Sequence, residues 1–439
     1  MRGEKMYCGL KKRAGLLAAG AFLGLSLVQG LSVQAGTWKD STFVQQITAS
    51  GMEAENTDLL FASDNIASGI YNGCKWVIDK NGTLTVRAVS KDGKVCDLSG
   101  DVWYNYKNDI VKVDVDVPYS SHLSGMFAGC KNVTEIRVKI DKTSGSAAGM
   151  FMVGGSSFNG NLTKLDVSQL NTSGITSMRQ MFKGCNALKE LDLSNWDTSN
   201  VTDMSYMFDG CYRIESLDVS NFKTGKVTTM EHMFYGCGKA KTSSWVCDVS
   251  KFDTRNLVDM SGMFGWVRSV KGYDKLKTSK VERMDYVFYR CGMKKLNLKK
   301  WDVSHVKDMS NMFQSCDNLQ SIDMTGWDTS NVTNMEYMFA FSEKLPEVDV
   351  TGFDTSSVED IGYMFKRCSA IRSLDLSSFD LSKLDVEQNR EYQERMENII
   401  GECSDILEIK TPKNLSISFE LPSYNGEWYR LDNGKKVTR

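Results

Sequence analysis

Proline and histidine are scarce in this 439-residue chain, which has four prolines and three histidines. His122, His232 and His305 lie far apart and none has a partner at ligand spacing, so we expect three isolated surface histidines and no metal site. A glycine-rich phosphate-binding loop is also missing. Aspartates and glutamates are plentiful but recur at repeating positions, so no catalytic carboxylate pair is distinguished. The sequence therefore predicts a protein that is not an enzyme, with no cofactor and no nucleic-acid partner.

Long apolar runs are limited to one, at residues 14–28, which follows five basic residues and precedes the small residues around Ala35. This order predicts a signal peptide over residues 1–35, removed near Ala35. The alternative is a membrane anchor, but the run is short for a span of about 20 residues. Removing residues 1–35 changes the formal net charge from −2 to −6. We expect a soluble, secreted extracellular protein, with retention at the cell surface left open.

A repeated unit of about 26 residues fills most of the rest of the chain. Each copy contains a Met-Phe pair, which is Val-Phe in one copy. The phenylalanines of these pairs are Phe127, Phe151, Phe182, Phe208, Phe234, Phe264, Phe288, Phe313, Phe339 and Phe365. Their intervals are 24, 31, 26, 26, 30, 24, 25, 26 and 26 residues, so insertions are confined to a few turns. One unit cannot bury its apolar face alone, and stacked copies can.

The clearest copy, residues 191–211, predicts the structure of one coil. Leu191 and Leu193 alternate with polar residues, as in a half-buried strand. Residues 197–200 are turn formers, and Val201 begins a second short strand. Met204, Met207, Phe208 and Cys211 have the spacing of a short helical turn. The fold class that we predict is a β-rich α/β repeat solenoid of leucine-rich-repeat-like coils.

The two ends of the solenoid differ from the repeat. We place an N-terminal β cap at residues 36–118, the solenoid of 10 to 11 coils at 119–410, and a C-terminal cap or tail at 411–439. Within the N-terminal cap, residues 76–86 read as a hairpin around Asn81-Gly82. Residues 387–403 have apolar residues at helical spacing and should enlarge the helix of the last coil.

The repeat resembles that of BspA-type leucine-rich-repeat surface proteins, in the variant with Met-Phe and Trp-Asp-Thr-Ser motifs that is common in mycoplasma surface proteins. Residues 191–211 and 327–335 carry the resemblance, which spans about residues 66 to 425. It implies an exported bacterial protein involved in adhesion to host or neighbouring-cell components. The chain lacks the asparagine ladder of better-known leucine-rich repeats, so a regular horseshoe is not implied.

Twelve cysteines are present, and eight of them occupy one position of the repeat. These are Cys130, Cys185, Cys211, Cys237, Cys291, Cys316, Cys368 and Cys403. Because their side chains would point in parallel from successive coils, we expect free thiols that behave as small buried hydrophobes. Cys247 lies at a strand leucine position and should also be buried. Cys74 and Cys96 flank the hairpin and are the one candidate disulfide, either bridged or free.

A series of aspartates occupies the outward position of the first strand: Asp166, Asp192, Asp218, Asp248, Asp323, Asp349 and Asp375. Like charges at stacking distance repel. The favoured interpretation is that these carboxylates accept hydrogen bonds in turns; the others are calcium binding and contact with a basic partner. Gly272 and Asn297 are expected to interrupt the series in two adjacent coils.

Residues 268–307 surround this interruption and contain twelve Lys or Arg against four Asp or Glu. One interpretation is a solvated face that relieves repulsion along the aspartate series. The other is a docking site for an anionic partner such as a sulfated glycan, a cell-wall polymer or an acidic protein. Lys294, Lys295, Lys299 and Lys300 are the candidate contact residues.

Tyrosines recur just before the Met-Phe pair, at Tyr206, Tyr286, Tyr337 and Tyr363, with His232 in phase. They suit contact with protein or sugar, and packing between neighbouring turns explains them equally well. Together these features predict a secreted or cell-surface bacterial binding or adhesion protein that makes multivalent contacts to host or cell-envelope proteins or glycans. The alternatives are an extracellular carbohydrate-active or proteolytic enzyme, which needs a cleft with a carboxylate pair, and a purely structural spacer, which binds nothing.

Overall fold

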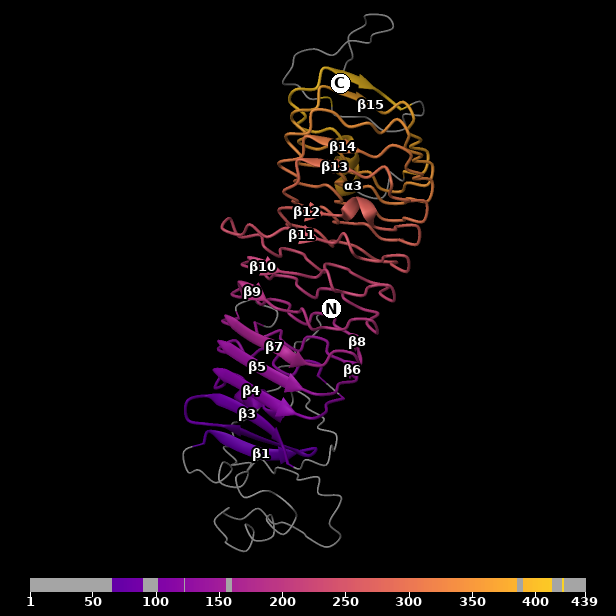
Figure 1. The fold of residues 1–439 in the computed structure, drawn as a ribbon. Helices are drawn as coiled ribbons and strands as arrows, with labels where there is room; N and C mark the ends of the chain where they lie inside the picture. The colour runs from indigo at the N-terminus through magenta and orange to yellow at the C-terminus, as the bar shows by residue number, and fades with distance from the viewer. Residues whose placement is uncertain are drawn as a thin grey trace, which may run out of the picture.

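The computed structural model describes residues 65–89, 102–121, 123–154, 160–384, 390–412 and 421. Over these residues the chain winds into one elongated stack of coils (Figure 1). The predicted fold class, a β-rich repeat solenoid, is confirmed. Residues 1–35, Cys96, His122 and most of the predicted C-terminal cap lie outside the described residues.

The regular elements are short. The strands of the N-terminal half are β1 (Ala67–Tyr71), β2 (Cys74–Ile78), β3 (Thr83–Ala88), β4 (Lys112–Val117), β5 (Glu135–Ile140), β6 (Gly145–Ser146), β7 (Lys164–Leu170) and β8 (Ile175–Ser177). Those that follow are β9 (Glu190–Leu191), β10 (Ser216–Leu217), β11 (Cys247–Asp248), β12 (Val270–Lys271), β13 (Lys295–Asn297), β14 (Ser321–Asp323), β15 (Ser373–Asp375) and β16 (Glu408–Lys410). The helices among the described residues are the 3-10 turns η2 (Tyr104–Tyr106) and η4 (Tyr273–Lys275) and the α-helix α3 (Arg390–Glu397).

The N-terminal end is a six-stranded sheet in the order β1-β2-β3-β4-β5-β7. Strands β1, β2 and β3 are antiparallel, and β2 and β3 form the predicted hairpin, in which Trp76 pairs with Val86. From β3 onward the pairing is parallel. The solenoid ladder therefore begins inside the predicted cap, and the sheet is continuous across residue 118.

Beyond β7 the strands pair in parallel, two at a time, as β9 with β10, β11 with β12, β13 with β14 and β15 with β16. Leu191 lies opposite Leu217, so equivalent residues of successive coils stack directly. A second ladder of single bridges runs from Ser177 through Asp203 to Asp360. This ladder lies at the position where the sequence predicts a second short strand, beginning at Val201.

The Met-Phe segment takes the form of consecutive hydrogen-bonded turns where the spacing predicts a helical turn. The Met207 amide donates to Met204 O, and the Cys211 amide donates to Phe208 O. The Tyr206 and Phe208 amides instead donate to carbonyls of the next coil, at 2.7 and 2.9 Å. An α-helix would use those amides internally, so the cross-coil bonds exclude it. The i, i+3, i+4, i+7 spacing is satisfied because each turn spans about as many residues as a helical turn.

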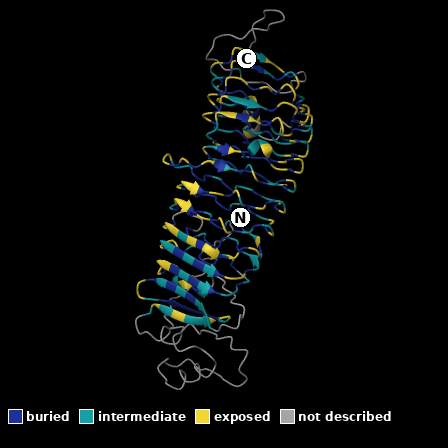
Figure 2. Cartoon of the chain, viewed as in Figure 1, coloured by how far each residue is buried: buried dark blue, intermediate teal, exposed yellow. Residues whose placement is uncertain are grey.

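The core is a column of phenylalanine rings along the stack. Phe182, Phe208 and Phe234 are fully buried, and neighbouring rings lie 5.5 to 5.6 Å apart, nearly parallel. Methionines of the same segment, such as Met207, are equally buried. Buried, intermediate and exposed segments are interspersed along the coils (Figure 2). The periodic Met and Phe residues thus form one continuous core, as predicted.

Buried threonines join the coils on another side of the stack. Thr198 Oγ1 donates to Lys223 O at 3.2 Å and accepts from the Lys223 amide at 2.8 Å. Thr329 makes the same pair of bonds to Asp354, at 2.8 and 2.9 Å. The Thr of the Trp-Asp-Thr-Ser motif therefore satisfies one donor and one acceptor of the next coil, which would otherwise be buried without partners.

The cysteines in phase with the repeat are buried and free, as predicted, and so is Cys247. Their thiols also donate hydrogen bonds to the preceding coil, for example Cys211 Sγ to Phe182 O at 3.3 Å and Cys316 Sγ to Phe288 O at 3.0 Å. Burial raises the pKa of the Cys185 thiol to about 12, which suppresses the reactive thiolate. Cys74 is disulfide-bonded. Because Cys96 lies outside the described residues, the Cys74–Cys96 bridge stays a prediction.

The last coil contains the predicted helix, α3. Its Arg395 forms ion pairs with Glu336 and, at 3.4 Å, with Asp360, which belong to the two preceding coils. The helix therefore packs on the stack through the ion pairs of Arg395 and through the buried side chain of Met396. Among the described residues no helix is long and apolar enough to span a membrane.

Candidate binding surfaces

The aspartates of the first strand are turn acceptors. Asp192 Oδ1 accepts the Ser194 amide at 2.9 Å, and Asp323 Oδ1 accepts the Thr325 amide at 3.1 Å. The backbone bond from Ser194 holds the pKa of Asp192 below its usual value. This supports the turn interpretation of the aspartate series. In the described part of the chain, no group of three His, Cys, Asp or Glu side chains is arranged to hold a metal ion.

The interruption of the aspartate series differs from the prediction by one residue. Lys271 lies opposite Asp248, and Gly272 is the residue after it. Lys271 Nζ contacts Asp248 Oδ2 at 2.8 Å, and this bond, with those from Ser250, lowers the pKa of Asp248 to about 2. Lys271 precedes Phe288 by 17 residues, whereas Asp248 precedes Phe264 by 16, so counting back from the Val-Phe pair misplaces the strand by one residue. Asn297 does occupy the position opposite Asp323.

The four candidate lysines lie around β13 and are all exposed. Lys295 begins β13, Lys294 precedes it, and Lys299 and Lys300 follow in the next turn. We call these four residues the lysine patch. The buried Leu296, Leu298 and Trp301 alternate with them and fix the backbone beneath.

None of the four lysines forms an ion pair with a described residue. Other cations of the strand face do, as in Lys271 with Asp248, Lys410 with Asp375 and Lys139 with Asp116. Asp323 in the next coil is influenced by the charge of Lys299 but does not pair with it. The lysine patch is thus a positive surface that lacks the internal counter-charges found elsewhere on this face.

The tyrosine series is partly buried and packs between coils. Tyr206 and His232 have ring centroids 4.9 Å apart, and Tyr337 and Tyr363 are 5.0 Å apart. Tyr206 also donates a hydrogen bond to Glu231 at 2.5 Å. Tyr206, His232, Tyr337 and Tyr363 all have left-handed backbone, with φ between 50° and 58°. Tyr286 differs, because its ring contacts Tyr289 of its own coil at 5.5 Å.

His232 is not the isolated surface histidine that the sequence predicts. Its side chain is 23% exposed and lies between Tyr206 and Tyr235, with ring centroids 4.9 and 4.8 Å away. The ring fits because Gly262 follows in the next coil, where a Cβ would lie 2.1 Å from it. Burial lowers the pKa of His232, so the ring is neutral near pH 7. His305 is exposed, as predicted.

A second aromatic group extends this one and was not foreseen from the sequence. Tyr235 and Tyr289 are parallel at 6.4 Å although one coil lies between them. Trp266, from that intervening coil, contacts Tyr289 edge-on at 6.2 Å. Lys239 Nζ lies 4.0 Å and Arg290 Cζ 4.5 Å from the centre of Trp266. These five residues are the aromatic-cation cluster. Periodicity could not reveal it because other coils have unrelated residue types at the positions of Tyr235 and Trp266.

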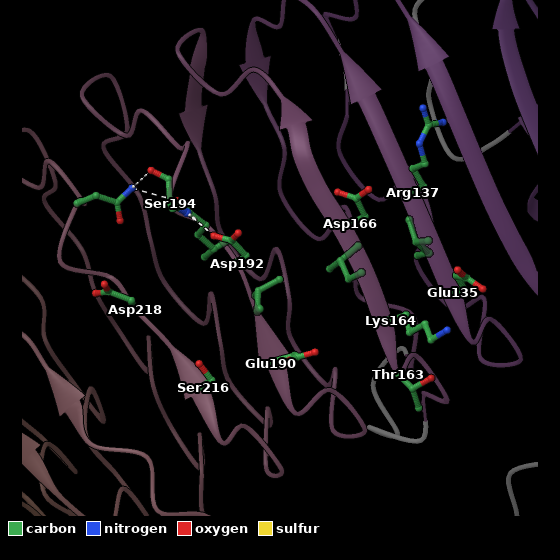
Figure 3. Close-up of a pocket in the computed structure, with 15 residues that line it drawn as sticks. Glu135, Arg137, Thr163, Lys164, Asp166, Glu190, Asp192, Ser194, Ser216 and Asp218 are labelled. Atoms are coloured by element: carbon green, nitrogen blue, oxygen red, sulfur yellow. Dashed lines mark hydrogen bonds between the residues drawn. The ribbon is translucent and has the colours of Figure 1, made fainter.

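A groove of about 570 Å³ opens between β7 and β9, which belong to different sheets (Figure 3). Leu165 and Leu191 are among its lining residues. The carboxylates of Asp166, Glu190 and Asp192 also line it (Figure 3). Trp196, of the β9 coil, has no hydrogen-bond partner for its buried Nε1. Trp327 in a later coil donates from Nε1 to Leu298 O of the coil before it, at 3.1 Å. The interval between Phe151 and Phe182 is 31 residues, longer than the usual 26, and this insertion is the feature of the sequence that indicates an irregular junction between the β7 and β9 coils.

Comparison with known proteins identifies the family. The model of the family described as "Mycoplasma protein of unknown function, DUF285" matches residues 148–272, 240–322 and 282–400, together more than half of the chain. The chain belongs to this family. The resemblance inferred from the Met-Phe and Trp-Asp-Thr-Ser motifs is thereby confirmed. The family description assigns no function, so the DUF285 match alone does not say what the surfaces bind. No curated protein matches the sequence.

Several solved structures are loosely similar. A leucine-rich repeat protein from Eubacterium ventriosum is 13% identical, with 79% of this chain and 85% of that one covered and a TM-score of 0.33. One from Bacteroides ovatus is 14% identical, with coverage of 80% and 100% and a TM-score of 0.32. A leucine rich cell surface protein from Faecalibacterium prausnitzii is 11% identical, with coverage of 82% and 100% and a TM-score of 0.25. Likeness at this level does not define a function.

Proposed function

We propose that this chain is an exported bacterial binding protein that docks an anionic partner on the lysine patch, by contact alone and without bond making. The observation that carries the proposal is a set of four exposed lysines that form no ion pair with a described residue, on a face where other cations have carboxylate partners. The partner classes that fit are sulfated glycans, cell-wall polymers and acidic proteins, which makes adhesion to a host or a neighbouring cell the expected role.

The solenoid supports such a role because it holds the charges in place before binding. β13 pairs with β14, and the buried Trp301 donates a hydrogen bond to Tyr273 O at 3.0 Å, so the backbone under the lysines is fixed. Only the side chains lose freedom on binding, which keeps the entropic cost small. Four like charges on one coil also raise the local potential and attract a polyanion from solution.

The experiment is a binding array of the purified protein against matrix proteins, sulfated and neutral glycans, and whole cells at about 0.15 M salt, where exposed charges are only partly screened. The test variant changes Lys294, Lys295, Lys299 and Lys300 to Glu. We expect its affinity for the anionic ligand to fall about 100-fold, because each reversed contact contributes several tenths of a kcal/mol or more.

A matched control changes Lys189, Lys223, Lys226 and Lys251 to Glu. These four lysines are also exposed, and the net charge changes by the same amount. We expect the control to bind within threefold of the parent. If both variants lose affinity equally, binding depends on net charge and the lysine patch is not the site. If the array detects no ligand, the protein is a spacer and the proposal is wrong.

A further inference from the structure

From Phe182 to Phe365, the second residue after the phenylalanine of each Met-Phe or Val-Phe pair has left-handed backbone, and we call this position the left-handed slot. Glycine occupies it at Gly184, Gly210 and Gly236, with φ from 69° to 78°. Trp266 and Arg290 occupy it in the next two coils, with φ of 61° and 52°. Glycine adopts this backbone without steric cost, whereas a side chain costs about 1 kcal/mol or more. Where a large side chain occupies this slot despite the cost, its contacts are expected to serve binding or stability.

The side chain of Trp266 lies in the aromatic-cation cluster, between residues from two other coils. Tyr235 approaches from the coil before, over Gly265, where a Cβ would lie 2.5 Å from the tyrosine ring. Tyr289 approaches from the coil after, at 6.2 Å from Trp266. All three rings are partly exposed. They therefore form a fixed platform of aromatic surface across three successive coils.

The cluster carries positive charge that the described residues leave unpaired. Neither Lys239 nor Arg290 forms an ion pair there, although Asp317 is influenced by the charge of Arg290. Burial and the charge of Arg290 lower the pKa of Lys239. Two cations beside one indole repel each other, and an anion bound between them would remove that repulsion.

The same slot two coils further on provides a contrast. Phe341 has φ of 62°, and Arg367 in the following coil lies 5.6 Å from its ring. Arg367, however, contacts Glu343 and Glu402 at 3.4 and 3.5 Å, so its charge is balanced inside the protein. Among the described residues, an aromatic residue in this slot thus contacts an arginine of the following coil twice, and the arginine without a carboxylate partner is Arg290, beside Trp266.

We propose that the aromatic-cation cluster binds an acidic saccharide, with sugar faces against Trp266 and Tyr289 and its sulfate or carboxylate groups beside Lys239 and Arg290. A sugar ring offers both a flat C–H face and rigidly placed anionic groups, the two features that this cluster can bind. Arg290 precedes Lys294 by four residues, which span at most about 14 Å. One acidic glycan chain can therefore contact the cluster and the lysine patch together, so the inference rests on the proposed function and names its ligand class.

The test compares Trp266→Gly with Phe341→Gly in the full chain. Glycine fills the left-handed slot at Gly184, Gly210 and Gly236, so both variants should fold, which thermal unfolding by circular dichroism checks. The probes are a heparin-derived octasaccharide and a polyglutamate chain of matched charge. We expect Trp266→Gly to lower octasaccharide affinity about tenfold, or about 1.4 kcal/mol, and to change polyglutamate affinity less than twofold. Phe341→Gly should leave both affinities unchanged.

Three results would overturn the inference. The first is an octasaccharide affinity within twofold of the parent in Trp266→Gly. The second is an equal loss of octasaccharide affinity in Phe341→Gly. The third is an equal loss for octasaccharide and polyglutamate in Trp266→Gly, which indicates a site for any polyanion, acidic peptides included. The lysine-patch variant separates the two proposals. If it stops binding both probes while Trp266→Gly has no effect, the proposed function stands and this inference fails; if it binds both like the parent, the proposed function fails.

Discussion

Replacing Phe208 with Ala is expected to lower the free energy of unfolding by about 4 kcal/mol. The ring is fully buried and stacks on Phe182 and Phe234 at 5.5 and 5.6 Å. Truncation removes its buried area and leaves a cavity that rigid coils on both sides cannot fill. In a solenoid, the coils are coupled to one another only by contacts between nearest neighbours. Weakening the contacts of Phe208 with Phe182 and Phe234 should therefore also make unfolding less cooperative.

Urea unfolding followed by circular dichroism measures this change, with Phe341→Ala as the control. Phe341 is an aromatic residue of the same stack of coils but is partly exposed and outside the column of buried rings. We expect the control to lose about 1 kcal/mol or less. A Phe208→Ala protein that unfolds within 1 kcal/mol of the parent would show that the phenylalanine column is not the main core.

The second large effect is expected for Gly174→Ala, with a loss of about 3 kcal/mol or more in unfolding free energy. A Cβ at Gly174 would lie 1.8 Å from Thr143 O and 2.7 Å from the carbonyl carbon. Both are backbone atoms of the preceding coil, so no side-chain rotation relieves the clash. The two coils would have to separate at the point where the Gly145 amide donates to Gly174 O.

Gly352→Ala is the matched control, because a Cβ at Gly352 would meet no atom within 4 Å and no left-handed backbone is required there. We expect its stability to change by about 0.5 kcal/mol or less. Thermal unfolding of the two variants makes the comparison. Equal stability of both variants would contradict the close approach of coils at Thr143.

The core of this protein could be predicted from its sequence because the residues that recur with the repeat are also the apolar ones. Phe208, Met207 and Cys211 recur with one spacing, and stacking places each against the same residue of the next coil, so their burial follows without knowledge of the backbone path. The hairpin of β2 and β3 was predictable for a local reason, since Asn81-Gly82 favours the tight turn that joins them.

Other features depend on how the coils meet, which spacing does not reveal. Tyr206 has left-handed backbone and its amide donates to Glu231 O of the next coil, and a tyrosine in the sequence indicates neither feature. Lys271 takes the aspartate position because one more residue separates it from Phe288 than separates Asp248 from Phe264. The repeat does not indicate a role for Trp266, because several other coils have glycine at the same position. A position that holds glycine in some coils and tryptophan in another has no periodic hydrophobicity.

The lysine patch was found from composition alone, since residues 268–307 are basic in an otherwise acidic chain. The structure adds that only some of those cations are unpaired: Lys271, Arg283 and Lys307 have carboxylate partners, and the lysines around β13 have none among the described residues. Pairing depends on which side chains face each other across coils. A charge count cannot supply that information.

Lysine acetylation footprinting tests the docking site most directly. The protein is acetylated with and without the heparin-derived octasaccharide, and the modification of each lysine is measured by mass spectrometry. We expect the bound ligand to protect Lys294, Lys295, Lys299 and Lys300, while Lys189, Lys223, Lys226 and Lys251 react as they do in the free protein. Equal protection of both groups, or protection of the second group alone, would contradict the account.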